Sequence, residues 1–164
     1  MSAYHKVILS LGSNIGDRKE YLQTAVENIH QRIGLISNIS SIFETPSWGF
    51  ESDPFYNIAI CANTHLPAQQ VLQECMLIEE QMGRTRKNTN GYAARVIDID
   101  LIFFDEEIIE SQTLTLPHPL MQERFFVLDP IAEIAPDFKH PILQQTVLQL
   151  KEICKDESKT KKIG

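Results

Sequence analysis

This 164-residue chain has no long apolar run. A membrane-spanning helix needs about 20 mostly apolar residues, whereas runs such as residues 101–104 are soon interrupted by charge. Positive charge is also scarce, since 15 Lys and Arg face 22 Asp and Glu and give a formal net charge of −7. That balance argues against broad attraction to nucleic acid or anionic lipid. We therefore expect neither as a partner, and an anionic ligand would need a local basic cluster.

Cysteine and signal-like patterns are equally sparse. The three cysteines, at positions 61, 75 and 154, are odd in number, show no Cys-x-x-Cys spacing and lie in apolar or amphipathic surroundings. These features are typical of reduced, buried thiols, so no chemistry is assigned to them. Residues 1–6 lack the basic start and the apolar stretch of a secretory signal. We therefore expect a cytoplasmic location.

The composition indicates a single compact domain. Hydrophobic residues make up 43% of the chain and charged residues 23%, a profile with which one domain of this length can bury a core. We place this domain at residues 1–154. Residues 155–164 contain four lysines and almost no apolar side chain, so a disordered tail is expected there.

The pattern of apolar residues predicts alternating strands and helices. Short or alternating apolar runs next to Gly or Pro predict strands, and apolar residues at steps of three and four predict helices. The predicted order is a strand at 4–11, a helix at 17–33, strands at 36–45 and 55–64, a helix at 67–83 and a strand at 96–104. Two right-handed crossovers then give a ferredoxin-like βαββαβ sandwich, an α/β (α+β) fold. Weaker patterns predict C-terminal additions, with a short strand near 114–116 and helices near 126–134 and 143–153.

Two aspartates in the last predicted strand are the sharpest chemical feature. Because side chains alternate along a strand, Asp98 and Asp100 share one face while the apolar residues around them point to the other. Their backbone positions would be roughly 6 to 7 Å apart, close enough to converge on Mg²⁺. The alternative is a solvated strand face, but strands are depleted in Asp and neighbouring like charges repel.

Basic residues cluster just before these aspartates. Arg84, Arg86 and Lys87 open a polar segment at residues 84–94, and Arg95 follows it directly. Guanidinium groups bind phosphate oxygens bidentately and stabilise charge in phosphoryl transfer. Beside a carboxylate metal site they indicate a nucleoside triphosphate as ligand. The alternative is a basic loop in solvent.

Other candidates are ambiguous when taken one by one. Asn57 lies on the polar face of its predicted strand and could bind a heterocycle, on whose faces Phe55 and Phe126 could stack. His118, between two prolines, forms a second cationic pair with Arg124. Core aromatics and a structural histidine are the alternatives. The glycines and Asn after the first strand lack the Lys of a P-loop, so a capped turn at Asn14 or Asp17 is the preferred interpretation there.

Five segments of the sequence form a recognisable set: Leu-Gly-Ser-Asn at 11–14, Phe-Tyr-Asn at 55–57, Gly-Arg-Thr-Arg at 83–86, Arg-Val-Ile-Asp-Ile-Asp-Leu at 95–101 and Leu-Pro-His-Pro at 116–119. Together, and in this order over roughly residues 7–134, they resemble 6-hydroxymethyl-7,8-dihydropterin pyrophosphokinase. The Arg-x-x-Asp-x-Asp element is the most specific of them. Residues 91–94 depart from the family, which often carries a basic residue, an aromatic and Gly-Pro there.

The resemblance implies a folate-pathway enzyme with a ferredoxin-like fold. Such an enzyme moves the β,γ-diphosphate of ATP onto the hydroxymethyl group of 6-hydroxymethyl-7,8-dihydropterin and releases AMP, with Mg²⁺ as cofactor. We expect it to act as a monomer. Two long loops, residues 46–54 and 84–94, are hypothesised to move and exclude water, because hydrolysis of ATP would otherwise compete.

The resemblance also assigns roles to individual residues by their position in the motifs. The expected catalytic group is Arg84, Arg95, Asp98 and Asp100, with both aspartates as Mg²⁺ ligands. The other contacts to ATP and its diphosphate would be Arg86, Thr115, His118 and Arg124, with Glu79 contributing behind them. The expected pterin site is Thr45, Pro46, Phe55, Asn57 and Phe126.

Two rival functions come from other classes. A ferredoxin-like regulatory module could hold a nucleotide without reacting it. A nucleic-acid-binding module is disfavoured by the charge of −7 and by the lack of a basic, aromatic-rich sheet face.

Overall fold

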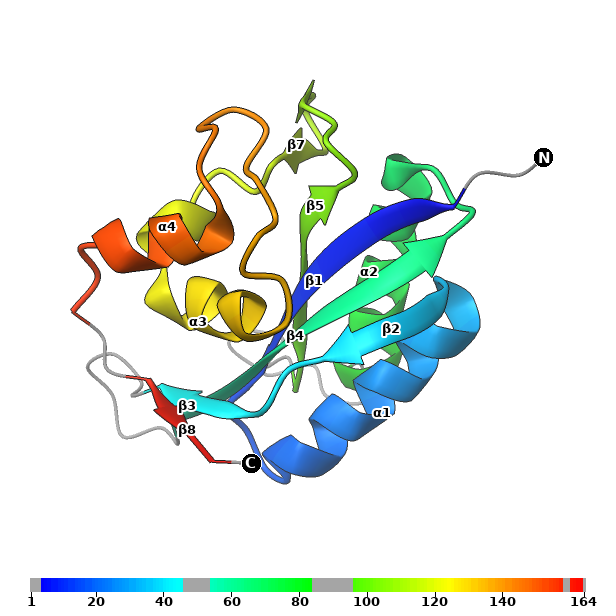
Figure 1. The fold of residues 1–164 in the computed structure, drawn as a ribbon. Coiled ribbons are helices and arrows are strands. Elements are labelled where there is room, and N and C mark those ends of the chain that lie inside the picture. Colours follow the sequence, from blue (N-terminus) through cyan, green and yellow to red (C-terminus); the bar gives the residue numbers. More distant parts are fainter. Residues whose placement is uncertain (1–3, 46–53, 84–95, 158–159, 164) are drawn as a thin grey trace.

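An antiparallel sheet organises the computed structural model, which describes residues 4–45, 54–83, 96–157 and 160–163 (Figure 1). Among these residues the main sheet has the strand order β5-β1-β4-β3-β8, with β2 also pairing with β4. Its strands are β1 (His5–Ser13), β2 (Leu35–Ile39), β3 (Phe43–Thr45), β4 (Phe55–Thr64), β5 (Asp98–Phe104) and β8 (Lys161–Lys162). A separate hairpin contains β6 (Ile109–Glu110) and β7 (Thr115–Leu116).

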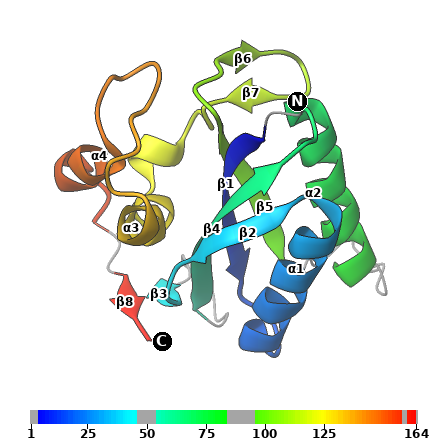
Figure 2. The same cartoon turned by 45° about the vertical axis from the view of Figure 1, so that its right-hand side comes forward.

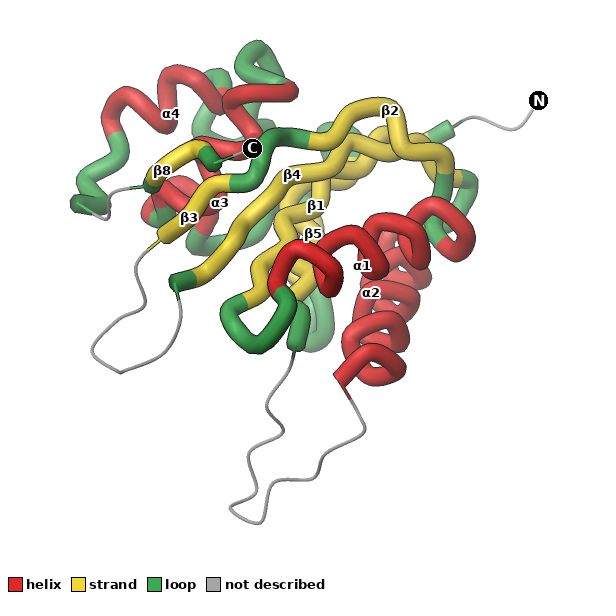
Figure 3. Tube along the Cα trace, turned by 90° about the horizontal axis from the view of Figure 1, so that it is seen from below, coloured by secondary structure: helices red, strands yellow, loops and turns green. Residues whose placement is uncertain are grey.

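Helices cover both faces of this sheet (Figures 2 and 3). On one face lie α1 (Arg18–Arg32) and α2 (Ala68–Gly83), and on the other lie α3 (Phe125–Ile134), after a short 3-10 turn at Met121–Glu123, and α4 (Val147–Ile153). Each face has its own apolar cluster. The helices α3 and α4 bury only part of their face, and the site described below occupies the remainder.

The predicted ferredoxin-like arrangement is confirmed. β1 pairs antiparallel with both β4 and β5 in the centre of the sheet. Because α1 and α2 each connect a strand to one that lies beyond a neighbour, the sheet forms by two interlocked split crossovers. The predicted turn before α1 is also confirmed, since Gly16 has φ +62° and the side chain of Asp17 accepts a hydrogen bond from the Glu20 amide at 3.2 Å.

The predicted strand at 36–45 is wrong in one respect, because the structure divides it into β2 and β3. Ser40 causes the break: its amide donates to the Ala59 carbonyl at 2.9 Å, and its hydroxyl accepts from the Ala59 amide at 2.8 Å. A side-chain oxygen thus replaces a backbone carbonyl in the ladder, and the register shifts between Ile36 and Asn38.

The tail at 155–164 also differs from the expectation of disorder. Its residues 161–162 form β8, which pairs with β3 through Phe43 and Glu44. This pairing uses backbone groups and leaves both lysine side chains exposed. The low apolar content of the tail, on which the expectation of disorder was based, therefore could not reveal the strand.

The C-terminal additions match their predicted types. α3 covers the helix predicted at 126–134, α4 is shorter than the predicted 143–153, and β7 lies within 114–116. Cys61 and Cys75 are buried free thiols, as expected, and Cys154 is half-buried. No helix within the described ranges has the length and apolar content to cross a bilayer.

Candidate active site

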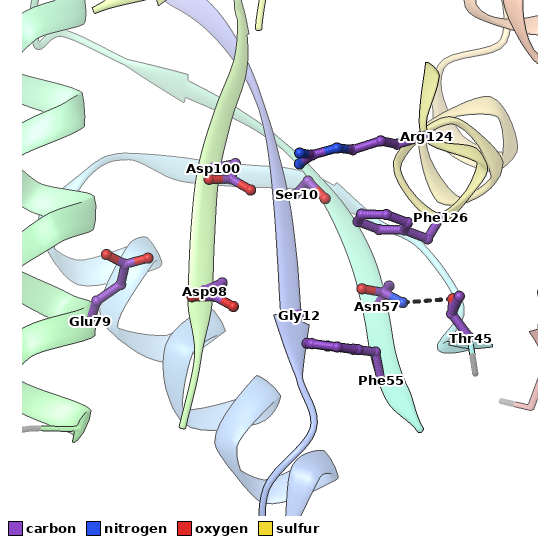
Figure 4. A pocket seen from close by; sticks show the side chains of 10 residues that line it. All are labelled: Ser10, Gly12, Thr45, Phe55, Asn57, Glu79, Asp98, Asp100, Arg124 and Phe126. Atoms are coloured by element: carbon purple, nitrogen blue, oxygen red, sulfur yellow. Dashed lines mark hydrogen bonds between the residues drawn. The ribbon is translucent and has the colours of Figure 1, made fainter. Parts of the chain in front are cut away.

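A cavity of about 360 Å³ opens on the sheet face beside α3 (Figure 4). It collects side chains from β1, β3, β4, β5, α2 and the start of α3. The lining residues are Ser10, Gly12, Thr45, Phe55, Asn57, Glu79, Asp98, Asp100, Arg124 and Phe126. Eight of these ten are site residues expected from the sequence, although they are spread over residues 45–126.

Strand register brings the polar residues together. Gly12 lies opposite Asn57 on one side and opposite Asp98 on the other, and Ser10 lies opposite Asp100. Directly opposed residues on one face of a sheet have Cβ atoms about 5 Å apart. The three central strands therefore hold a carboxylate pair on β5 beside an amide on β4, with the small residues of β1 as the floor between them.

The same three strands are apolar further along this face. Ile8 of β1, Cys61 of β4 and Ile102 of β5 pack against α3 and α4 in the second apolar cluster. Each strand changes from apolar to polar where the helices no longer cover it. The cavity is thus the uncovered end of a sheet face whose other end is core.

Asn57 is held in a fixed orientation at the end of the cavity nearest β3. Its Nδ2 donates to Thr45 Oγ1 at 2.9 Å, and both residues are buried. A buried amide without partners would cost several kcal/mol, and this bond gives the amide nitrogen one partner. Gly12 leaves room for the amide oxygen, because a Cβ there would lie 2.9 Å from Asn57 Oδ1.

Two aromatic rings frame this amide. Phe55, at the start of β4, and Phe126, in the first turn of α3, lie on either side of Asn57 (Figure 4). Both are half-buried. A flat heterocycle can stack against such rings while its edge bonds to the amide.

At the other end of the cavity, Asp98 and Asp100 project from β5 (Figure 4). The intervening Ile99 points into the core beneath α1 and α2, as the predicted alternation requires. Glu79 of α2 lies behind them, and its Oε2 accepts a hydrogen bond from the Ile99 amide at 2.7 Å. Among the described strands β5 lies at the edge of the sheet. Glu79 therefore gives the Ile99 amide an acceptor on the side where these strands offer none, and so steadies the strand that carries both aspartates.

Arg124 places a positive charge near these carboxylates, and the imidazole of His118 lies close to both Asp100 and Arg124. Burial lowers the pKa of His118, the nearby Asp100 raises it, and Arg124 lowers it further, so the net shift is downward. The backbone N–H of Leu120 donates to His118 Nδ1 at 3.2 Å, which leaves the proton of the neutral ring on Nε2. The guanidinium of Arg124 lies 5.9 Å from the centre of the Phe126 ring, and its side chain extends past that ring toward Ser10 and Asp100 (Figure 4).

Some expected site residues are not in the cavity lining. Thr115 is exposed in β7. His118 interacts electrostatically with Asp100 and Arg124, which line the cavity, but His118 itself is not among the lining residues. Pro46, Arg84, Arg86 and Arg95, like the two loops expected to move, fall outside the described residues, apart from residue 54 of the first loop.

Sequence reasoning missed Ser10 and took Gly12 for a turn residue. Ser10 lies within the buried run of β1 and Gly12 follows it, and their two-residue spacing from Ile8 puts both on the face of Ile8. That spacing was the one feature of the sequence that could have placed Ser10 and Gly12 on the face of the site. It pointed to no chemistry on its own, because serine and glycine bind nothing specific unless neighbouring strands supply the rest of the site.

Comparison with known proteins identifies the family. The family model for 7,8-dihydro-6-hydroxymethylpterin-pyrophosphokinase matches residues 8–136. The 2-amino-4-hydroxy-6-hydroxymethyldihydropteridine pyrophosphokinase of Porphyromonas gingivalis is 41% identical over 82% of this chain and 93% of its own length. The Bacillus subtilis protein of the same name is 43% identical over 77% and 75% of the two chains.

Solved structures share the fold. A Plasmodium falciparum HPPK-DHPS structure superposes with a TM-score of 0.75 at 17% sequence identity and covers 93% of this chain. This chain spans only 46% of that longer protein. With the family model matching most of the chain and relatives above 40% identity, this protein belongs to the 7,8-dihydro-6-hydroxymethylpterin-pyrophosphokinase family.

Proposed function

We propose that this protein transfers the β,γ-diphosphate of ATP to the hydroxymethyl group of 6-hydroxymethyl-7,8-dihydropterin in folate biosynthesis. Family membership supports this activity. The observation that carries it at the level of residues is one cavity with two chemically different ends. An amide between two aromatic rings forms one end, and a carboxylate pair beside an arginine forms the other.

The amide end suits the pterin. Its ring system is flat and has a polar edge with N–H donors and a carbonyl acceptor. Because Asn57 Nδ2 is engaged with Thr45, Oδ1 is the atom oriented to accept from the pterin edge. Phe55 and Phe126 would then cover the two faces of the ring.

The carboxylate end suits a triphosphate with its metal ion. Asp98 and Asp100 offer oxygen ligands of the kind that Mg²⁺ prefers, from adjacent positions on one strand face. When bound there, Mg²⁺ would offset charge on the phosphate oxygens. Arg124 would contact the diphosphate, and His118 Nε2 is a further donor. Arg84, Arg86 and Arg95 remain predicted phosphate contacts from the sequence.

The reaction is an in-line displacement at the β-phosphorus. The hydroxymethyl oxygen forms a bond to that phosphorus, the bond to the oxygen bridging the α- and β-phosphorus breaks, AMP leaves, and the hydroxyl proton passes to solvent. The residues of this chain contribute by holding the two substrates in line and by placing positive charge beside the transferred group. Ser10 and Gly12 are small, which leaves room between the two ends for the reacting atoms to meet.

Product analysis tests this function. The protein is incubated with ATP and Mg²⁺, with and without the reduced pterin, and AMP and pterin diphosphate are quantified. We expect AMP to form only when the pterin is present, in a 1:1 ratio to pterin diphosphate as the stoichiometry requires. Nucleotide binding without AMP formation would instead indicate the regulatory module, and ADP as product would contradict diphosphate transfer.

A further inference from the structure

We propose that the C-terminal strap, defined as the described residues 156–157 and 160–163, positions both walls of the pterin end of the cavity. This inference rests on the proposed function. The strap contacts α3, which carries Phe126, and β3, which carries Thr45. None of the described strap residues lines the cavity, so the effect of the strap would be exerted through the residues it holds.

The first contact replaces a missing helix cap. α3 has Arg124 at its N-cap position, and no side-chain hydrogen bond is made by that residue to the helix end. Arginine has no acceptor atom, whereas Ser, Thr, Asp and Asn are preferred there because they accept from the first amides. Asp156 supplies the acceptor from 31 residues away: its Oδ2 accepts from the Phe125 amide at 2.9 Å. The negative charge also suits the positive end of the helix dipole.

This arrangement explains how an arginine can occupy the cap. With capping provided by Asp156, the side chain of Arg124 is available to point into the cavity, and Phe126 follows one residue after the capped amide. Both residues that α3 contributes to the site therefore flank the contact with the strap. Loss of Asp156 would leave the first turn of α3 without this acceptor and would loosen the two side chains together.

The second contact holds α3 along its length. The hydroxyl of Thr160 donates to Asp129 Oδ2, and Lys162 Nζ lies 3.0 Å from Glu133 Oε2. The other oxygen of Glu133 accepts from the amide of Ser41 at 2.5 Å. Burial raises the pKa of Glu133, but hydrogen bonds from Ser41 and Lys162 outweigh it and lower the pKa overall. Glu133 is thus a charged junction between the strap, α3 and the chain entering β3.

The third contact extends the sheet. β8 pairs with β3 at Phe43 and Glu44, and the Ile163 amide donates to the Ile42 carbonyl at 2.8 Å. Thr45 follows directly as the last residue of β3 and carries the hydroxyl that orients Asn57. β3 has only three residues, so a strand of this length gains much of its definition from neighbours on both sides.

The experiment compares Asp156→Ala with Asp156→Asn in the full chain. Removing a cap costs about 1 kcal/mol, roughly a five-fold change in an equilibrium constant. We expect Asp156→Ala to raise the KM for the pterin, and its Kd beside a nonhydrolysable ATP analogue, by about five-fold. kcat at saturation should stay within about two-fold, because the groups that contact the reacting atoms are retained. Asp156→Asn keeps an acceptor oxygen and should restore most of the affinity.

Matched controls separate positioning from mere stability. Asp137→Ala removes an exposed aspartate in the loop after α3 and should leave the pterin KM unchanged. Ile163→Pro deletes the amide that donates to Ile42 and should raise the pterin KM even if Asp156→Ala proves unstable. A fall in Tm with unchanged pterin KM and Kd in both strap variants would overturn the proposal. A parent protein that forms no AMP with the pterin would instead overturn the proposed function.

Discussion

Gly12→Ala is the substitution whose effect the structure defines most closely. The new Cβ would lie 2.9 Å from Asn57 Oδ1 and 3.7 Å from the Phe55 ring. A carbon and an oxygen that are not bonded need roughly 0.5 Å more than this first distance. β1 is the central strand between β4 and β5 and cannot retreat, so the Asn57 amide must turn.

The cost follows from what Asn57 would lose. Turning the amide breaks its 2.9 Å bond to Thr45 and moves Oδ1 from the position proposed to accept from the pterin. Leaving one buried polar group without a partner costs about 1–3 kcal/mol. We therefore expect the pterin Kd of Gly12→Ala to rise roughly 5- to 150-fold, while binding of an ATP analogue alone changes little.

A double-mutant cycle with Asn57→Ala checks the mechanism. If the added methyl acts by displacing Asn57, Gly12→Ala should weaken pterin binding strongly in the parent and hardly at all in the Asn57→Ala background. The assay is the pterin Kd for all four proteins, measured by calorimetry beside a nonhydrolysable ATP analogue. Additive losses would show that the methyl obstructs the pterin directly and would refute the reasoning.

Three other predictions concern the triphosphate end. Asp98→Ala and Asp100→Ala should each abolish Mg²⁺-dependent turnover with an unchanged circular dichroism spectrum, and residual Mg²⁺ dependence would remove them as ligands. Arg95→Ala should lower kcat on the order of 10³-fold, whereas parent-like turnover would exclude that role. His118→Gln should reduce the loss of Tm between pH 7.5 and 5.5. Burial lowers the pKa of His118 in the folded protein below its ordinary 6.5. As pH falls, His118 therefore binds a proton in the unfolded chain before it does in the folded protein, and the folded protein loses stability. An unchanged pH dependence would contradict this.

The spacing of apolar residues was sufficient to predict most elements of the fold, because strands and helices repeat with different periods. β4 places Ile58, Ile60 and Ala62 on one apolar cluster, with Ala59 and Cys61 on the other. The alternation predicted for this strand is therefore confirmed, with successive side chains on opposite faces of the sheet. The break between β2 and β3 depends on a serine bonding to a strand 19 residues away, and no local period can reveal such a contact.

The site divides in the same way. Asp98 and Asp100 could be paired from the sequence because both lie on one strand, and a two-residue spacing fixes their common face. Asn57 could be noted as a candidate from its place on the polar face of a strand, but Thr45 could be singled out only by resemblance. The bond between them joins β3 and β4, and the local sequence of neither strand determines how the two align. Asp156 carried no signal at all, because its partner is a backbone amide 31 residues away, and backbone groups look the same in every sequence.

The length of α3 explains where the cavity begins. On β1 the face beneath this helix carries Ile8 and then Ser10, and on β5 it carries Ile102 and then Asp100. The register shift between Ile8 and Leu9 lets Ile102 and Phe103 both face α3, although strict alternation would send one of them to the other side. The bulge thus concentrates apolar area under the helix and leaves the positions beyond it for polar residues. The arginine at the N-cap of that helix then lies at the boundary between core and cavity. A side chain that must reach a phosphate needs a fixed backbone, and this boundary provides one.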